Sequence, residues 1–170
     1  SIVVLHACCH NPTGADLSEA QWKEVVGIVR ARGLVAFIDM AYQGFADGIE
    51  PDALALRLFA ASGLQFFVSS SFSKSFSLYG ERVGALSIVT ASKDESARVM
   101  SQVKRVVRTN YSNPPTHGGA VVAAVLSSPE LRKQWEEELA GMRDRIRAMR
   151  TGLVDKLKAR GVAQDFSFVA

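Results

Sequence analysis

Several short segments of the sequence carry side chains that suit covalent chemistry on a carbonyl compound. Each segment follows or flanks an apolar run, and together they offer an amine, a carboxylate, a phenol, an amide, hydroxyls and a guanidinium. The side chains concerned are Asn11, Asp39, Tyr42, Ser71, Ser73, Lys74 and Arg82. A lysine amine condenses with an aldehyde to give a Schiff base, which exchanges readily with a substrate amine. The set therefore indicates a site for an aldehyde.

The remaining groups fit the other parts of a phosphorylated pyridine aldehyde. A carboxylate such as that of Asp39 keeps a pyridine nitrogen protonated, and the ring can then accept electrons from a carbanion. Serine hydroxyls and a guanidinium bind phosphate, the arginine through two parallel hydrogen bonds. The inventory thus matches what a phosphorylated pyridine aldehyde requires.

The apolar runs and turn residues between these side chains predict an α/β fold. Strands buried on both faces are expected at 2–6, 34–38, 66–68 and 83–89. A capping box of Ser18 and Gln21 is predicted to begin the first helix, which Gly33 ends. Strands that alternate with helices favour a largely parallel sheet. Ligands bind beyond the carboxyl ends of such strands, where the reactive side chains fall.

The second part of the chain is predicted to be mostly helical. Helices are expected at 92–109, 116–126 and 129–160, and an alternating strand is expected at 165–170. The first and last predicted strands have no evident partner at the chain ends. We therefore expect the sequence to be a piece of a larger protein.

The composition is that of an ordinary globular protein and excludes some partners. The chain has 170 residues, of which 48% are hydrophobic and 22% charged. Its net charge of +3 comes without basic runs interleaved with aromatics, so no nucleic acid is expected to bind. No apolar run approaches the roughly 20 residues that cross a bilayer, so no membrane partner is expected. The adjacent Cys8 and Cys9 favour a reducing compartment over a disulfide framework.

Other kinds of site find less support. Cys8, Cys9 and His10 offer metal-binding atoms, but successive residues of a strand face opposite ways and do not converge easily. His6 and His117 have no evident acid–base partner. Neither Gly-x-Gly-x-x-Gly nor a P-loop occurs, so nicotinamide and nucleoside triphosphate sites are not supported.

In their order and spacing, these segments resemble the class I (fold type I) pyridoxal-phosphate-dependent aminotransferases, in particular the aspartate and aromatic subgroup. The motifs are Asn11-Pro12-Thr13-Gly14, Asp39-Met40-Ala41-Tyr42, Ser71-Phe72-Ser73-Lys74, Gly80-Glu81-Arg82-Val83-Gly84 and Asn110-Tyr111-Ser112-Asn113-Pro114-Pro115. The resemblance implies that residues 1–126 are part of the large cofactor-binding domain, a mostly parallel sheet flanked by helices. Residues 127–170 would form a long helix and the start of the small C-terminal domain.

The resemblance also implies roles. Lys74 matches the lysine that holds pyridoxal 5'-phosphate and shuttles a proton, and Asp39 matches the partner of the pyridine nitrogen. Tyr42 and Asn11 match the residues that hydrogen-bond the ring oxygen, and Asn11 is also expected at the substrate. The catalytic residues would be Lys74, Asp39 and Tyr42. The phosphate-binding stretch contains Ser71, Ser73 and Arg82.

Transamination is the implied activity, between an L-amino acid (aspartate and/or aromatic) and a 2-oxo acid such as 2-oxoglutarate. The implied enzyme is a cytoplasmic homodimer. Arg108 matches the arginine that reaches across the dimer to a dicarboxylic substrate, with Arg105 one helical turn away as the alternative. β-Elimination or decarboxylation on the same scaffold remains an open alternative, as does a piece that does no chemistry, and we predict that the 170 residues alone are inactive.

Overall fold

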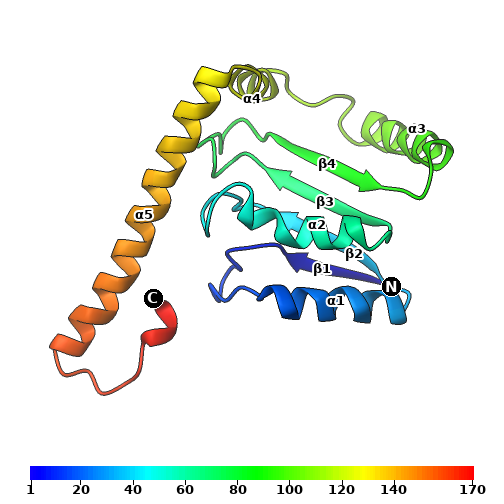
Figure 1. Cartoon of the computed structure of the whole chain (residues 1–170). Coiled ribbons are helices and arrows are strands. Elements are labelled where there is room, and N and C mark those ends of the chain that lie inside the picture. Colours follow the sequence, from blue (N-terminus) through cyan, green and yellow to red (C-terminus); the bar gives the residue numbers. More distant parts are fainter.

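The computed structural model describes all 170 residues and is built on a four-stranded sheet. The strands β1 (Ile2–His6), β2 (Val35–Met40) and β3 (Phe66–Ser71) lie side by side in chain order and run parallel. At the edge, β4 (Gly84–Val89) pairs with β3 in the antiparallel direction (Figure 1). The prediction of an α/β fold with a mostly parallel sheet is confirmed.

Five α-helices and two short 3₁₀ helices complete the chain. They are α1 (Glu19–Ala31), η1 (Pro51–Ala53), α2 (Leu54–Ala61), α3 (Lys93–Asn110), α4 (His117–Ser127), α5 (Pro129–Ala159) and η2 (Ser167–Val169). The capping box of Ser18 and Gln21 is present at the start of α1, as predicted. The strand predicted at 165–170 is wrong. The carboxylate of Asp165 accepts hydrogen bonds from the backbone and hydroxyl of Ser167, which favours a tight turn there.

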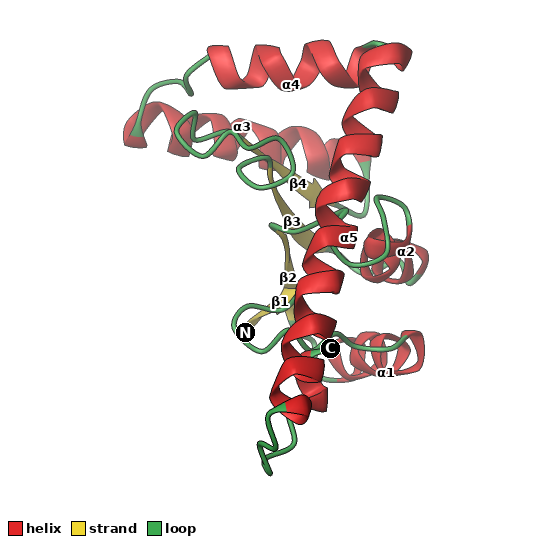
Figure 2. Cartoon of the chain, turned by 90° about the vertical axis from the view of Figure 1, so that its left-hand side faces the viewer, coloured by secondary structure: helices red, strands yellow, loops and turns green.

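The core lies between the sheet and the helices α1 and α2. Ala36 and Ile38 of β2 and Phe59 of α2 are fully buried, and Trp22 of α1 packs in the same cluster. Figure 2 shows α1 and α2 on one side of the sheet and α3 on the other. Burial of this apolar layer fixes the strands, and therefore the positions at which they end.

The opposite face of the sheet is only partly covered. Ile2 and Val4 of β1 are 67% and 66% exposed, and Leu86 of β4 is 52% exposed. The prediction that these strands are buried on both faces is therefore wrong for β1 and β4 in this chain. On this face a groove lies between α3 and the strands β3 and β4, lined by Phe67, Leu86 and Ile88.

The long helix α5 runs past the carboxyl ends of the parallel strands (Figure 1). Its Trp135 stacks on Phe76, with 4.6 Å between ring centroids, and the indole N–H donates to the Ser75 carbonyl at 2.7 Å. One turn later, Leu139 is 1% exposed and lies against Gly44. These contacts place the middle of α5 over the loops that follow β2 and β3. No helix of the structure is both long and apolar enough to span a bilayer.

Candidate active site

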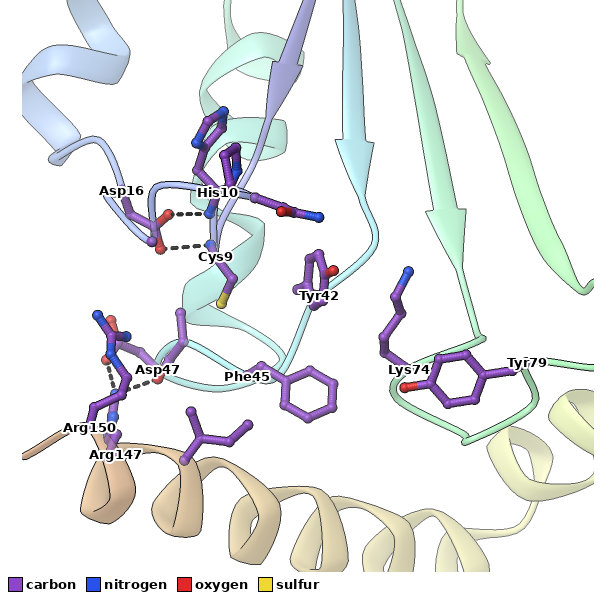
Figure 3. A pocket seen from close by; sticks show the side chains of 15 residues that line it. Cys9, His10, Asp16, Tyr42, Phe45, Asp47, Lys74, Tyr79, Arg147 and Arg150 are labelled. Carbon is purple, nitrogen blue, oxygen red and sulfur yellow. Dashed lines mark hydrogen bonds and ion pairs between the residues drawn. The ribbon is translucent and has the colours of Figure 1, made fainter. Parts of the chain in front are cut away.

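A cavity of about 600 Å³ lies between the carboxyl ends of the parallel strands and α5. Asn11, Tyr42 and Lys74 line it from the loops after β1, β2 and β3, while Arg147 and Arg150 line it from α5 (Figure 3). Three of the residues predicted from separate segments of the sequence therefore share one cavity. This is the position at which open parallel sheets bind ligands.

The amine of Lys74 faces the ring of Tyr42. The Lys74 Nζ lies 5.0 Å from the centroid of that ring, and the lysine is half-buried. Attraction between the ammonium and the face of the phenol holds the side chain toward the cavity. The next residues form a turn in which Ser77 has a left-handed φ of 54°, a conformation that is uncommon for a residue with a Cβ. A primary amine is thus fixed at the cavity wall.

The loop that carries Asn11 is held by one carboxylate. Asp16 accepts hydrogen bonds from the backbone N–H groups of Cys9 at 2.7 Å and His10 at 3.0 Å. These bonds support Cys9 in a left-handed conformation, with φ of 50°, which turns the chain from β1 toward the cavity. Asn11 itself is exposed at the mouth of the cavity.

A second carboxylate, that of Asp52, organises the loop that carries Tyr42. Asp52 is 5% exposed and accepts four backbone N–H groups. The donors are Gly44 at 2.7 Å, Ala46 at 3.1 Å, Asp47 at 2.8 Å and Gly48 at 3.2 Å. Sequence reasoning missed Asp52. Its position directly after Pro51 at a helix start, close to a glycine-containing loop with free N–H groups, was the available signal.

Asp39 lies on β2 beside the cavity but does not line it. Its Oδ1 accepts a hydrogen bond from the Ser69 hydroxyl at 3.0 Å, and its Oδ2 lies 3.8 Å from His6 Nε2. The prediction that His6 has no acid–base partner is therefore wrong. The same holds for His117, whose Nδ1 lies 3.0 Å from Glu81 Oε2.

The residues of the predicted phosphate-binding stretch lie outside the cavity wall. The Ser71 hydroxyl accepts the backbone N–H of Ser73 at 3.2 Å, and Ser73 is 7% exposed. Arg82 is exposed, has a left-handed φ of 53°, and donates to the carbonyl of Tyr79 at 3.0 Å. Tyr79 does line the cavity. The phosphate-binding role of the three residues remains a prediction.

Arg108 does not line the cavity either. It lies in the last turn of α3, is exposed, and donates to the Ser112 hydroxyl at 2.5 Å. Its predicted substrate contact is therefore not made within the chain. The cavity contains instead Arg147, which pairs with Asp47 at 2.5 Å, and Arg150. Neither was predicted as a site residue, because both belong to a helix that is charged along much of its length.

The adjacent thiols differ in their surroundings. Cys8 is buried, and the hydrogen bond to Cys9 together with burial raises its pKa. Cys9 lines the cavity, and the hydrogen bond from Cys8 lowers its pKa, with a smaller contribution from Arg150. Burial and the carboxylates of Asp16 and Asp52 oppose this shift in Cys9. The thiolate form of Cys9 is therefore favoured over that of Cys8.

Comparison with known proteins shows what the chain as a whole resembles. The family model described as aminotransferase class I and II matches residues 1–170. An aspartate aminotransferase of Pseudomonas aeruginosa is 72% identical over 169 residues, which are 99% of this chain and 42% of that protein. An aromatic-amino-acid aminotransferase of Escherichia coli is 52% identical over 169 residues, 99% of this chain and 43% of that protein.

Solved structures give the same result for the fold. The crystal structure of an aromatic-amino-acid aminotransferase from Burkholderia pseudomallei, covalently bound to pyridoxal phosphate, superposes with a TM-score of 0.98 at 73% identity. The match covers 99% of this chain and 42% of that one. The chain thus spans about 42% of the length of these relatives.

Proposed function

Because the chain belongs to the class I and II aminotransferases, we propose that the whole protein is a pyridoxal-phosphate-dependent transaminase. It would move an amino group between an L-amino acid, aspartate and/or aromatic, and a 2-oxo acid such as 2-oxoglutarate. The observation that carries the proposal is the convergence of Asn11, Tyr42 and Lys74 on one cavity. The names of the relatives, aspartate and aromatic-amino-acid aminotransferase, support the substrate class.

Asn11, Tyr42 and Lys74, which line the cavity, fit the aldehyde and ring-oxygen side of pyridoxal 5'-phosphate. The cavity of about 600 Å³ is large enough for the cofactor, and a half-buried primary amine faces it. Lys74 would hold the aldehyde carbon, and Asp39 would hold the pyridine nitrogen. Tyr42 and Asn11 would donate to the ring oxygen, and Ser71, Ser73 and Arg82 would bind the phosphate. When bound, the cofactor supplies an electron sink for negative charge at the substrate Cα.

The chain's own residues then orient and move protons. The Lys74 Nζ, a primary amine at the cavity wall, would accept and return a proton. The Tyr42 ring under that amine limits where the nitrogen can go. The carboxylate of Asp39, held by Ser69, would keep a proton on the nitrogen that it faces.

We further propose that the whole protein is a homodimer. Arg108 is exposed and lies outside the cavity of its own chain, so a substrate's second carboxylate would meet the Arg108 of another copy. We propose a cytoplasmic location because both cysteines are free thiols. We also propose that the 170 residues alone do not turn over, since they span about 42% of the relatives' length.

Intact mass spectrometry tests the cofactor assignment. The whole protein is incubated with pyridoxal 5'-phosphate, reduced with borohydride and mapped by peptide, beside a Lys74→Ala variant. We expect one adduct, on Lys74, and none in the variant. No adduct in the folded whole protein would refute the proposal. Assaying glutamate, ammonia and carbon dioxide with aspartate or phenylalanine as donor then separates transamination from elimination and decarboxylation.

A further inference from the structure

We propose that the first two residues of α4, His117 and Gly118, position Arg82 for the cofactor phosphate by holding the residues on either side of it. The inference rests on the proposed function, because Arg82 is expected to bind that phosphate. Neither residue of α4 lines the cavity, so both act through Glu81 and Val83 rather than on cofactor or substrate. They are therefore positioning residues.

The backbone of Arg82 has a conformation that needs support from its surroundings. Its φ of 53° lies in the left-handed region, which a residue with a Cβ rarely adopts. Such a conformation persists where neighbouring contacts hold it. The Arg82 side chain donates to the Tyr79 carbonyl at 3.0 Å. The N–H of Glu81 donates to the Leu78 carbonyl at 3.2 Å. Both bonds lie within one turn, so neither attaches that turn to the rest of the protein.

The first attachment of the turn is to the residue that follows β3. The N–H of Phe72 donates to the Val83 carbonyl at 3.2 Å, directly beyond the pairing of β3 with β4. Phe72 lies between Ser71 and Ser73, the two serines expected at the phosphate. The bond therefore joins the serines to the segment that carries Arg82.

The start of α4 supplies the second attachment. Gly118 is buried, and a Cβ added there would lie 2.7 Å from the Glu81 Cβ and 3.2 Å from the Val83 Cβ. The close approach is possible because residue 118 has no side chain. A Cβ added to the next residue, Gly119, would meet nothing within 4 Å. The tight fit against the turn is thus specific to one of two adjacent glycines.

His117 adds a polar contact to the same attachment. Its Nδ1 lies 3.0 Å from the Glu81 Oε2, and the two side chains are 75% and 34% exposed. An ionised carboxylate only accepts hydrogen bonds, so Nδ1 carries a proton and donates. An exposed pair of this kind contributes little to stability, but it restrains the direction in which Glu81 points. Contacts on both neighbours of Arg82 therefore fix the turn relative to α4.

Two pairs of substitutions separate this role from general stability. The methyl group of Gly118→Ala pushes α4 and residues 81–83 apart, whereas Gly119→Ala on the same helix is the matched control. Both substitutions raise helix propensity by the same amount. His117→Ala removes the donor to Glu81, whereas His117→Asn keeps an amide N–H near the Nδ1 position.

The measurement compares pyridoxal 5'-phosphate with pyridoxal, which lacks the phosphate, by titrating each into the whole protein freed of cofactor. We expect the dissociation constant of pyridoxal 5'-phosphate to rise about tenfold in Gly118→Ala and about threefold in His117→Ala, because the guanidinium no longer faces the phosphate squarely. The dissociation constant of pyridoxal should stay within about twofold of the wild type in both variants. Gly119→Ala and His117→Asn should match the wild type for both compounds.

Three results would overturn the inference. They are equal weakening of both compounds, equal loss in His117→Asn and His117→Ala, and wild-type affinity for pyridoxal 5'-phosphate in Gly118→Ala or His117→Ala. If Gly118→Ala does not fold, the two variants of His117 decide.

Hydrogen exchange of the whole protein without cofactor gives an independent test. Residues 79–84 should exchange faster in His117→Ala than in Gly119→Ala, because the turn has lost one of its attachments. Equal exchange in the two variants would contradict the inference. Failure of the wild type to form the borohydride adduct on Lys74 would count against the proposed function, and the exchange comparison would still test whether His117 holds the turn.

Discussion

Replacing Asp52 should destabilise the protein more than most single substitutions of a charged residue. The perturbation is Asp52→Ala, with Asp52→Asn as the nearly isosteric partner. The carboxylate is 5% exposed and accepts four backbone N–H groups within eight residues of it. In the alanine variant these four N–H donors lose their partner, and the donors that stay buried cannot form replacement hydrogen bonds with water.

The magnitude follows from counting bonds. Each hydrogen bond contributes on the order of 1 kcal/mol net, so four bonds to one carboxylate give about 4 kcal/mol for Asp52→Ala. The asparagine amide keeps one oxygen, which can accept two of the four N–H groups, while its NH₂ faces the other two. We therefore expect about 2–3 kcal/mol for Asp52→Asn.

Urea denaturation followed by circular dichroism measures the free energy of unfolding, and hydrogen exchange reports on residues 42–48 directly. Faster exchange should be confined to that loop in Asp52→Asn and should be accompanied by weaker cofactor binding, because the loop carries Tyr42. The reasoning is refuted if Asp52→Asn unfolds within 0.5 kcal/mol of the wild type, roughly the scatter of a neutral surface substitution, with loop protection unchanged.

Three other outcomes are expected. Gly44→Ala should lower the free energy of unfolding, measured by urea denaturation, by about 2–3 kcal/mol. Gly44 has a φ of 96°, and an added Cβ would lie 2.4 Å from a methyl carbon of Leu139. An unchanged free energy of unfolding would mean that the close approach of α5 is not maintained. Trp135→Phe keeps an aromatic ring but loses the N–H that donates to the Ser75 carbonyl, so the free energy of unfolding should fall by about 1 kcal/mol. No change would show that a hydrogen bond to water replaces this bond without loss. Iodoacetamide should modify Cys9 before Cys8, because the pKa of Cys9 is lowered and that of Cys8 is raised. The preference should be clearest at a pH below the ordinary thiol pKa. Peptide mapping measures the order, and modification of Cys8 first would contradict the assignment.

The parts of the site that were predictable from the sequence share one property. Lys74, Tyr42 and Asn11 each follow an apolar run that predicts a strand, and side chains beyond the carboxyl ends of parallel strands lie close together, so their convergence could be predicted without knowledge of contacts. The helix boundaries were likewise local, as the capping box of Ser18 and Gln21 shows.

The parts that were missed depend on register and on backbone donors. His6 and Asp39 are far apart in the sequence, and their pairing follows from the alignment of β1 with β2, which apolar runs do not specify. Asp52 accepts hydrogen bonds from backbone N–H groups that every loop residue possesses, so its place after Pro51 at a helix start indicates a capping role but not which donors it binds. Exposure of Ile2 was missed because an apolar strand predicts burial but does not say which element supplies the cover.

The docking of α5 sets how strongly the cavity responds to helix tilt. The helix has 31 residues, and it is tied to the strand-end loops by Trp135 and Leu139 and further along by Arg143 and Arg147, while Arg150 on the cavity wall lies eleven residues beyond Leu139. At a rise of 1.5 Å per residue this arm is about 16 Å long, so a tilt of about 10° about Leu139 carries Arg150 by about 3 Å. The contacts of Arg143 with the Gly44 carbonyl and of Arg147 with Asp47 lie on this arm and limit such a tilt, so their loss would let a small tilt of α5 change the width of the cavity mouth by roughly one water diameter.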